Sequence, residues 1–357
     1  MSTPNFSRCS KFLLEWYTMH SRDLPWRKSN GAYGVWVSEI MLQQTRIEAV
    51  IPYYHRFMQA CPTVFDVAAL PEEQLLKLWE GLGYYSRARN LQRAAKVIVA
   101  DYAGRLPADY HRLLSLPGVG EYTAGAIASI AYDIPVPAVD GNVMRVLARL
   151  TGDDTDVLSS CAKRHYADVV YKMLPHDQAG RFNQALMELG ERICLPKATP
   201  ECACCPWASE CVAYAKGLTG VLPVRSKKKP RRIEERVLAV VCVAGDPPRV
   251  LLHKRSSEGL LADLWELPNA LLAEKDRLFP LEIAEQCRYM KDLGTAKHIF
   301  SHVEWRMQGQ LYRMPHTALP NGYKAVTLQE LQQEYALPAA FRHYAAMLPQ
   351  LLHKEDM

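Results

Sequence analysis

The sequence lacks the features that mark a membrane-embedded or secreted protein. Nowhere in its 357 residues does an apolar run approach the ~18 consecutive residues that a membrane-spanning helix needs. The N-terminal stretch has no basic start followed by an apolar block and a small-residue cleavage site, so no secretory signal is evident. We therefore expect a cytoplasmic protein without a membrane partner, whose thiols stay reduced.

Extremes of composition and charge are also absent. Hydrophobic residues make up 49% and charged residues 23%, which excludes collagen-like, low-complexity and largely disordered chains. The net charge is only +5, a balance that permits a polyanionic partner without demanding one. At roughly 150 residues per domain, the length indicates two or three domains.

Strand-like alternation is scarce before residue 236, and that part of the chain has the pattern of helices. Residues 217–236 combine glycine, proline and a basic run, which is typical of a linker. Beyond the linker, β-branched runs flank a Gly-Asp-Pro-Pro turn, and a helical tail follows from about residue 327. The fold class is therefore mostly α, with an all-helical domain at 1–216, a basic linker at 217–236 and a smaller α+β domain at 237–357. Helical segments are expected at 37–59, 109–115, 121–132, 142–150, 160–173, 180–193 and 327–352.

The ten cysteines do not form the pattern of a disulfide scaffold, because five of them lie between residues 194 and 211. Cys194, Cys202, Cys205 and Cys211 are separated by seven, two and five residues, and the Cys-x-x-Cys pair can place two thiolates on one metal centre. Four thiolates suit either Zn²⁺ or an iron–sulfur cluster. The spacing alone does not choose between them.

A Leu-Pro-Gly-Val-Gly sequence at 116–120 lies between two predicted helices. Such a turn is either a simple tight connection or a phosphate site, since it leaves N–H groups bare at a helix N-terminus. A helix of small residues follows it, and the whole pattern resembles a helix-hairpin-helix, a motif that clamps the DNA backbone without regard to sequence. Gly118, Val119 and Gly120 would then contact the DNA backbone.

Two carboxylates are candidates for acid–base chemistry. Glu39 lies in an otherwise apolar helical stretch, where it is either an exposed helix residue or an acid kept protonated by burial. Asp140 precedes a helical run, so it is either an N-cap alone or an anion near a site, with its pKa lowered by the helix dipole. One carboxyl with a raised pKa and one with a lowered pKa is the pattern of glycosidic cleavage.

Together these motifs resemble the MutY-type adenine DNA glycosylases of the endonuclease III superfamily. The stretches that carry the resemblance are VSEIMLQQT, WEGLGYYSRARNL, LPGVGEYT, PAVDGNVMRV and FNQALMELG, and the resemblance covers essentially the whole chain. It implies removal of adenine mispaired with 8-oxoguanine or guanine in double-stranded DNA, after the adenine is flipped out of the duplex. It further implies a monomer that is cytoplasmic and associated with a bacterial nucleoid.

The resemblance also implies roles for individual residues. Glu39 corresponds to the acid that protonates adenine at N7, and Asp140 to the carboxylate that stabilises the sugar oxocarbenium ion or adds to it. Tyr122 and Asn142 correspond to residues that position those two groups. The adenine pocket would be lined by Arg22, Trp26, Arg27, Leu42 and Gln184. The residues that wedge the duplex and touch the 8-oxoguanine would be Gln44, Thr45, Leu82 and Tyr84.

The cysteines correspond to the ligands of a [4Fe–4S] cluster in that family, with one departure. The usual first gap is six residues, which here would place the second ligand on Glu201. We therefore assign Cys194, Cys202, Cys205 and Cys211 as the metal ligands and Cys204 as a thiol that does not bind the cluster.

The second domain resembles a MutT-like (Nudix-like) fold, whose opening turn corresponds to GLLADLWELP. The following segment has no helix with the acidic metal site of a Nudix hydrolase, so we expect no pyrophosphatase activity. Phe300, Ser301 and His302 match the loop that senses 8-oxoguanine in the family; without that match they could equally be a bare strand turn.

Other classes of protein remain alternatives. A bifunctional glycosylase and lyase of the endonuclease III type would carry a Schiff-base lysine just after the hairpin, where this chain has Tyr122. A Nudix-type nucleotide hydrolase would need the acidic metal helix. A catalytically dead DNA-binding protein would have lost Glu39 or Asp140.

Overall fold

The computed structural model describes residues 4–28, 31–196, 199–226 and 230–352. The chain divides into two compact units, one of residues 1–69 and 90–227 and the other of residues 70–89 and 228–357. The predicted division had placed residues 70–89 in the first domain, whereas here they group with the C-terminal unit. In the part of the chain that the structure describes, no helix is long and apolar enough to cross a membrane.

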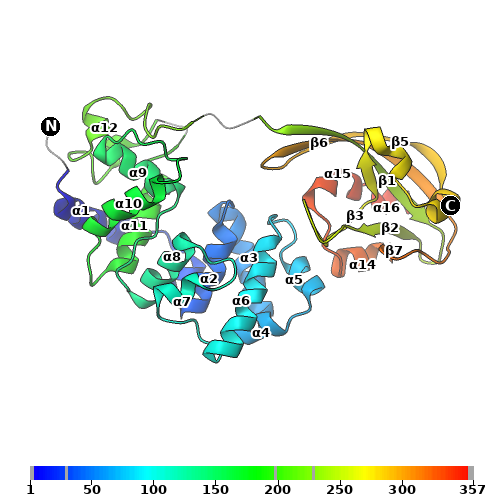
Figure 1. Cartoon of the computed structure of the whole chain (residues 1–357), viewed down its shortest axis with the longest axis horizontal. Coiled ribbons are helices and arrows are strands. Elements are labelled where there is room, and N and C mark those ends of the chain that lie inside the picture. The colour runs from blue at the N-terminus through cyan, green and yellow to red at the C-terminus, as the bar shows by residue number, and fades with distance from the viewer. Residues whose placement is uncertain (1–3, 29–30, 197–198, 227–229, 353–357) are drawn as a thin grey trace. The chain divides into compact units, whose positions relative to one another are not determined.

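The first unit is helical, in agreement with the predicted fold class (Figure 1). Its α-helices are α1 (Phe6–His20), α2 (Gly31–Leu42), α3 (Ile47–Ala60), α4 (Val64–Ala69), most of α6 (Ser86–Tyr102), α7 (Tyr110–Leu114), α8 (Glu121–Tyr132), α9 (Gly141–Thr151), α10 (Ala162–Met173), α11 (Ala179–Arg192) and α12 (Val212–Ala215). Two 3₁₀ turns, η1 (Pro25–Arg27) and η2 (Cys202–Cys204), complete it.

The single helix predicted over 37–59 is two helices, α2 and α3. The break lies at Gln44, whose φ of 59° is left-handed and cannot continue a right-handed helix. This break places the C-terminal end of α2 beside α8, and the two helices pack together.

A continuous apolar core joins α1, α9, α10 and α11. Leu147 and Phe182 are fully buried there, and Trp207, from the cysteine-rich segment, packs into the same cluster. The core therefore holds α9 and α11, two of the helices that line the candidate site, against the cysteine-rich segment.

The second unit contains α5 (Glu72–Leu78) and a seven-stranded mixed sheet in the order β3-β2-β1-β6-β5, with β4 paired to β1 and β7 paired to β2. The strands are β1 (Arg232–Val243), β2 (Arg249–Lys254), β3 (Trp265–Glu266), β4 (Asn269–Leu271), β5 (Arg288–Ile299), β6 (Val303–Met314) and β7 (Tyr323–Thr327). β1 begins at Arg232, inside the stretch predicted as linker, while residues 227–229 of the basic run lie outside the described residues.

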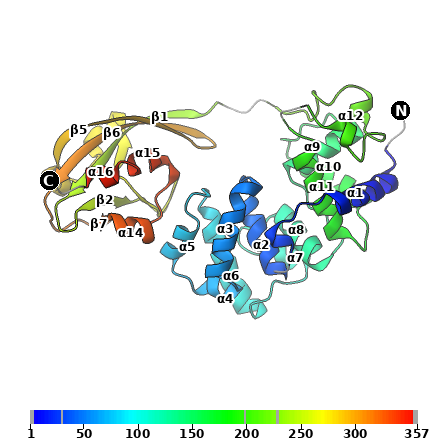
Figure 2. The ribbon, with the colours of Figure 1, turned by 180° about the vertical axis from the view of Figure 1, so that it is seen from behind.

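Apolar residues cover both faces of this sheet beside the second part of β1, because residues 237–243 form a continuous apolar run that is buried on both sides. Leu238, Val240 and Cys242 point into one cluster and Val237, Ala239 and Val241 into the other. The first cluster is closed by the C-terminal segments, which Figure 2 shows beside the sheet. They are short pieces and not one helix over 327–352: α14 (Leu328–Gln333), η4 (Ala339–Phe341), α15 (Arg342–Ala345) and α16 (Leu348–Leu351). The second cluster is closed by η3 (Leu272–Arg277) and α13 (Leu281–Ala284).

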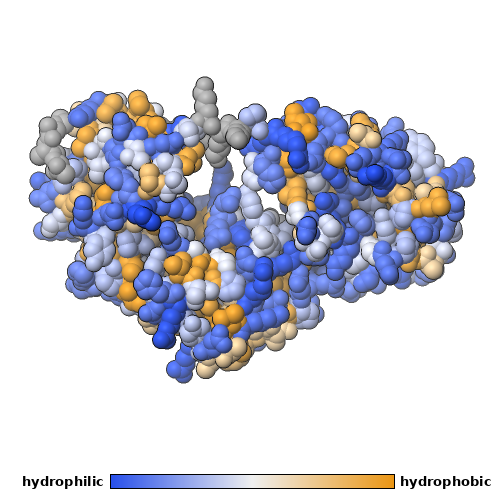
Figure 3. Space-filling view, viewed as in Figure 1, coloured by the Kyte–Doolittle hydropathy of each residue, from blue (hydrophilic) through white to orange (hydrophobic). Residues whose placement is uncertain are grey.

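Hydrophilic side chains cover most of the face seen in Figure 3, and the hydrophobic ones form small separate patches. Surfaces of this kind are ordinary for globular proteins and need no membrane or large apolar partner to explain them.

Candidate active site

A single pocket in the first unit brings Glu39, Tyr122, Asp140 and Asn142 together. These residues come from α2, from the start of α8 and from the start of α9, segments far apart in the sequence. The other residues that line the pocket are Arg22, Leu24, Trp26, Arg27, Val35, Ser38, Leu42, Thr45, Ile47, Ile130, Gln184, Met187, Glu188 and Glu191.

Glu39 is a buried acid. It is 5% exposed, and the Tyr122 hydroxyl donates to its Oε2 at 2.7 Å. Its pKa is raised to about 7: burial is the largest cause, the hydrogen bond from Tyr122 lowers the pKa, and the charge of Asp140 raises it. A carboxyl with this pKa can hold and release a proton near neutral pH, which is the property of a general acid.

Asp140 is the N-cap of α9, as the sequence suggested. Its Oδ1 accepts from the Val143 backbone N–H at 2.7 Å, and its Oδ2 accepts from Asn142 Nδ2 at 3.1 Å. The expectation of a lowered pKa is wrong, because burial raises the pKa of this carboxyl above its ordinary value. The bonds from Val143 and Asn142 and the charge of Arg145 oppose that rise without cancelling it.

The extended segment before Asp140 is fixed by a buried amide. Asn183 of α11 is fully buried; its Nδ2 donates to Ser129 Oγ and to the Val136 carbonyl, and its Oδ1 accepts from Ala138 N–H. The segment also passes close to α8 at Gly125, where a Cβ would lie 2.1 Å from the Pro137 carbonyl oxygen. These contacts set the position at which Asp140 enters the pocket.

Arg22 and Arg27, predicted to line the adenine pocket, both bind Glu188 of α11. Arg22 Nε lies 2.7 Å from Glu188 Oε1, and Arg27 Nη2 lies 2.9 Å from Oε2. Glu188 is 1% exposed, and although burial raises its pKa, the bonds to Arg22 and Arg27 outweigh burial and lower it overall. This carboxylate therefore stays an anion, and the ion-pair cluster builds one wall of the pocket.

The sequence analysis missed Glu188 and Glu191. A signal was present: Gln184, Glu188 and Glu191 recur at intervals of four and three residues in α11, so all three lie on one helix face. Polar residues that share a helix face with a predicted site residue, here Gln184, are themselves candidates for the site.

Trp26, Leu42, Thr45 and Gln184 also line the pocket. Gln44 is exposed and is not among the lining residues. The four residues predicted to contact 8-oxoguanine are divided between the two units: Gln44 and Thr45 belong to the first, and Leu82 and Tyr84 belong to the second.

In the second unit, Tyr84, Phe300, Ser301 and His302 line one cavity. Tyr84 is 44% exposed and has a left-handed φ of 48°, whereas Leu82 is buried and does not line this cavity. The Phe300 N–H donates to the Val303 carbonyl, which closes a tight turn, and the Phe300 ring packs edge-on against Trp305 with centroids 5.0 Å apart.

The predicted hairpin lies between α7 and α8. Gly118 has a left-handed φ of 75°, and a Cβ there would lie 2.5 Å from the Asn90 side chain. Gly120 is the N-cap of α8 and has no side-chain cap, and a Cβ on it would meet open space. Val119 is buried. The first turn of α8 therefore keeps backbone N–H groups without a side-chain cap, as an anion site requires.

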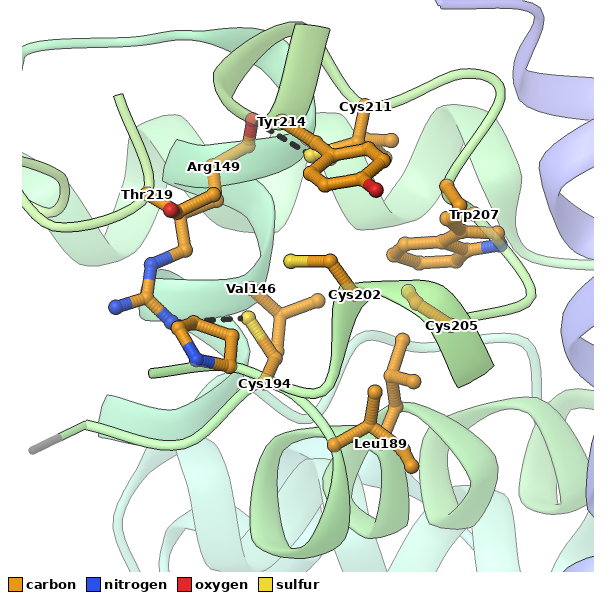
Figure 4. A pocket seen from close by; sticks show the side chains of 14 residues that line it. Val146, Arg149, Leu189, Cys194, Cys202, Cys205, Trp207, Cys211, Tyr214 and Thr219 are labelled. Carbon is orange, nitrogen blue, oxygen red and sulfur yellow. Dashed lines mark hydrogen bonds between the residues drawn. The ribbon is translucent and has the colours of Figure 1, made fainter. Parts of the chain in front are cut away.

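The four cysteines assigned as ligands line a common cavity between α9, α11 and η2 (Figure 4). Cys204 is exposed and is not among the lining residues. Arg149 borders the cavity, with its Nη1 3.2 Å from Cys194 Sγ. Within the described residues no group of three or more His, Cys, Asp or Glu side chains is arranged to hold a metal ion.

Comparison with known proteins matches both units. The HhH-GPD superfamily of base excision DNA repair proteins matches residues 37–168, and the NUDIX domain matches residues 238–347.

Several characterised relatives carry the name adenine DNA glycosylase. The mouse protein is 35% identical over 93% of this chain and 77% of its own length. The human protein is 33% identical over 94% of this chain and 74% of its own length. The protein of Buchnera aphidicola subsp. Acyrthosiphon pisum is 30% identical over 86% of this chain and 87% of its own length.

Solved structures match the helical unit. A thermostable thymine-DNA glycosylase matches with a TM-score of 0.55 and 28% identity, over 59% of this chain and 98% of its own. Endonuclease III in a non-covalent complex with DNA matches with a TM-score of 0.51 and 25% identity, over 61% of this chain and 99% of its own. The predicted fold class, a helix-hairpin-helix glycosylase domain followed by a Nudix-like domain, is confirmed.

Proposed function

The chain belongs to the adenine DNA glycosylase family, and on this premise we propose that it removes adenine mispaired with 8-oxoguanine or guanine in double-stranded DNA. The reaction is hydrolysis of the N-glycosidic bond, and the product is an abasic site. The observation that carries the proposal is the buried Glu39–Tyr122 pair, which shares one pocket with Asp140.

Glu39 is the acid for the leaving base. Adenine has to leave the duplex stack to reach the pocket, at a cost of a few kcal/mol. Tyr122 occupies Oε2 of Glu39, which leaves Oε1 to carry the proton that is donated to adenine N7. Protonation makes the base a better leaving group and lowers the barrier to cleavage.

Asp140 is the anion for the sugar. As the bond to adenine breaks, positive charge develops on the deoxyribose, and a carboxylate in a water-poor pocket stabilises that charge strongly. The Val143 N–H and the Asn142 amide bind both oxygens of Asp140 and support its ionised form. Asn142 thereby binds the anion, Asp140, and Tyr122 binds the acid, Glu39.

Lesion choice belongs to the second unit in this proposal. Ser301 and His302 offer hydrogen-bonding groups beside the aromatic rings of Tyr84 and Phe300 in one cavity. That combination suits a flat oxidised purine, which needs both a stacking surface and polar partners at its edge. In the first unit, Gln44 and Thr45 would contact the opened base step.

The N-terminus of α8 would contact the DNA backbone. Gly120 begins α8 without a side chain that blocks a phosphate, whereas the Val119 N–H already donates to the Leu116 carbonyl. This contact carries no sequence information, and it fixes the protein's position along the duplex.

Cys194, Cys202, Cys205 and Cys211 would hold a [4Fe–4S] cluster. The chemistry of the donors supports this, because four thiols, the ligand type of such a cluster, line one cavity and Cys204 is exposed and does not line it. When bound, the cluster supplies a cross-link that holds the 195–210 loop for DNA docking, and it takes no part in base hydrolysis. Cys194, which follows α11, would thereby be tied to Cys202 of η2 and to Cys205 and Cys211 without a disulfide.

The enzyme is monofunctional in this proposal. A lyase forms a Schiff base with an amine at the sugar, and at position 122 this chain has a phenol whose hydroxyl is bonded to Glu39. Strand breaks should therefore follow only after heat or alkali.

The test is single-turnover cleavage of duplexes that carry adenine opposite 8-oxoguanine, guanine or thymine, with and without alkali. We expect alkali-dependent strand breaks that form fastest opposite 8-oxoguanine. Equal rates opposite 8-oxoguanine and thymine would refute the lesion preference, and nicking without alkali, trapped by borohydride on a lysine, would refute the monofunctional reaction.

A further inference from the structure

A fourth carboxyl group, that of Glu191, lines the pocket at the end occupied by Asp140. It belongs to the last turn of α11 and is exposed at the rim. Its Oε1 accepts from Asn142 Nδ2 at 3.1 Å, and the same nitrogen donates to Asp140 Oδ2 at 3.1 Å. One amide group therefore lies between two carboxylates.

The other end of this amide is fixed as well. Asn142 Oδ1 accepts from Arg145 Nη2 at 2.9 Å, and Arg145 Nη2 also donates to the Gly190 carbonyl at 2.9 Å. If the amide turned over, its oxygen would face two carboxylates and its nitrogen would face a guanidinium, and both contacts are repulsive. Glu191 and Arg145 thus select one orientation of Asn142 from opposite sides.

We propose that Glu191 is a positioning residue for adenine removal: it holds the Asn142 amide against Asp140 and adds negative charge at the sugar end of the pocket. This inference rests on the proposed function, because the rate of adenine removal is the quantity that tests it. It adds to the site a residue that acts through Asn142 and through its field, without a proton transfer of its own.

The electrostatic surroundings of Asp140 make the proposal specific. Arg145 from α9 lowers the pKa of Asp140, whereas Glu191 from α11 raises it. Glu39 from α2 and Tyr122 from α8 share the pocket, and the groups that shift the pKa of Glu39 are Tyr122, Asp140 and Arg27. Loss of the charge at Glu191 should therefore change the ionisation of Asp140 and leave that of Glu39 in place.

The experiment compares Glu191→Gln, Glu191→Ala and a control, Glu15→Gln, which removes an exposed glutamate charge from α1. Single-turnover rates are measured on adenine opposite 8-oxoguanine and opposite guanine, from about pH 5 to about pH 9. Thermal unfolding of each variant reports whether it is folded.

Glu191→Gln keeps an oxygen that can accept from Asn142 and loses only the charge, so we expect a rate about three- to tenfold lower. Glu191→Ala also releases the amide and should be slower than Glu191→Gln. In Glu191→Gln the acidic limb of the pH profile should move to lower pH, because Asp140 ionises more easily, while the alkaline limb stays. In Glu191→Ala the released amide no longer supports the ionised form of Asp140, so this shift should be smaller. Glu15→Gln should match the wild type.

Unchanged rates in folded Glu191→Gln and Glu191→Ala would overturn the proposal. A loss of rate that is uniform across pH would also overturn it, because that is the result of a purely structural role. If the wild type cleaves neither mispair, the proposed function fails. If it cleaves both and the variants do not differ from it, only this inference fails.

Discussion

The sharpest test of the site is Glu39→Gln, because the substitution keeps the shape of the side chain and removes its proton. The Tyr122 hydroxyl, 2.7 Å from Oε2, can still donate to the amide oxygen of glutamine. The pocket should therefore remain folded and should still admit adenine. What the variant lacks is a carboxyl proton for the departing base.

The size of the effect follows from the role of a general acid. Loss of such a group costs about 10²- to 10⁴-fold in rate, which corresponds to about 3 to 5 kcal/mol of barrier. We expect single-turnover cleavage of adenine opposite 8-oxoguanine to fall by at least about a hundredfold. Binding of the uncleaved duplex, measured by fluorescence anisotropy, should stay near that of the wild type.

The pH profile of the wild type gives an independent measurement. Burial raises the pKa of Glu39 to about 7, so the acid form is present below that pH and is lost above it. The rate should therefore fall as the pH rises through about 7. Tyr122→Phe removes a hydrogen bond that lowers this pKa, so its alkaline limb should lie at higher pH than that of the wild type.

Two results would refute this reasoning. One is near-wild-type cleavage by Glu39→Gln, which would mean that another group protonates the base. The other is an alkaline limb that moves to lower pH in Tyr122→Phe, which would mean that Tyr122 does not stabilise the ionised form of Glu39.

Four further predictions concern stability, metal, lesion choice and reaction class. At pH 8 Glu39→Gln should be more stable than the wild type, by up to about 3 kcal/mol in the free energy of unfolding, and should unfold at a higher temperature. The reason is that the buried carboxylate of Glu39 destabilises the folded wild type when it is ionised, an effect that appears above the ordinary pKa of glutamate and is absent well below it. Equal stability at pH 8 would contradict this. Cys204→Ser should keep its iron, about four atoms per chain, whereas Cys202→Ser should lose most of it, and the reverse result would move the second ligand to Cys204. A Ser301→Ala, His302→Ala double variant should keep adenine removal opposite guanine while its preference for 8-oxoguanine shrinks, and an unchanged preference would exclude these residues as the sensor. Tyr122→Lys should gain borohydride trapping and direct nicking, with slower base removal because Glu39 loses its hydroxyl partner; no gain in trapping would mean that position 122 does not face the sugar.

Local patterns were enough to predict the fold class. The absence of alternation before residue 236 and the strands after it indicated a helical unit and an α+β unit, and both are confirmed. Breaks inside apolar stretches were harder to predict. The left-handed residue Gln44 divides 37–59 into two helices, and nothing in its side chain demands that conformation. The tail after residue 327 was also predicted as helix, but Pro338 and Pro349 interrupt it and only short pieces form.

The chemistry of the site was predictable where a motif carried it and not where tertiary contacts did. Glu39 and Asp140 were found from their local context, but their pKa values depend on which groups surround them. For Asp140 the helix N-terminus alone predicts a lowered pKa, and burial reverses that direction. Glu188 lies in the FNQALMELG stretch and Glu191 directly follows it, but their importance follows only from how α11 packs beside α8 and α9.

Burial raises the pKa of both Glu39 and Asp140, so a difference in their remaining contacts has to separate the acid from the anion. Glu39 accepts a hydrogen bond from Tyr122, and it also lies in the field of Asp140, which favours its neutral form. Asp140 accepts from the Val143 N–H and from Asn142 and lies near Arg145, and all three favour its ionised form. The contacts of Asp140 with Val143, Asn142 and Arg145 therefore oppose the effect of burial on its pKa, whereas the charge of Asp140 adds to the effect of burial on the pKa of Glu39. Because Asn142 supplies one of the three contacts of Asp140, the groups that hold Asn142 take part in keeping acid and anion apart.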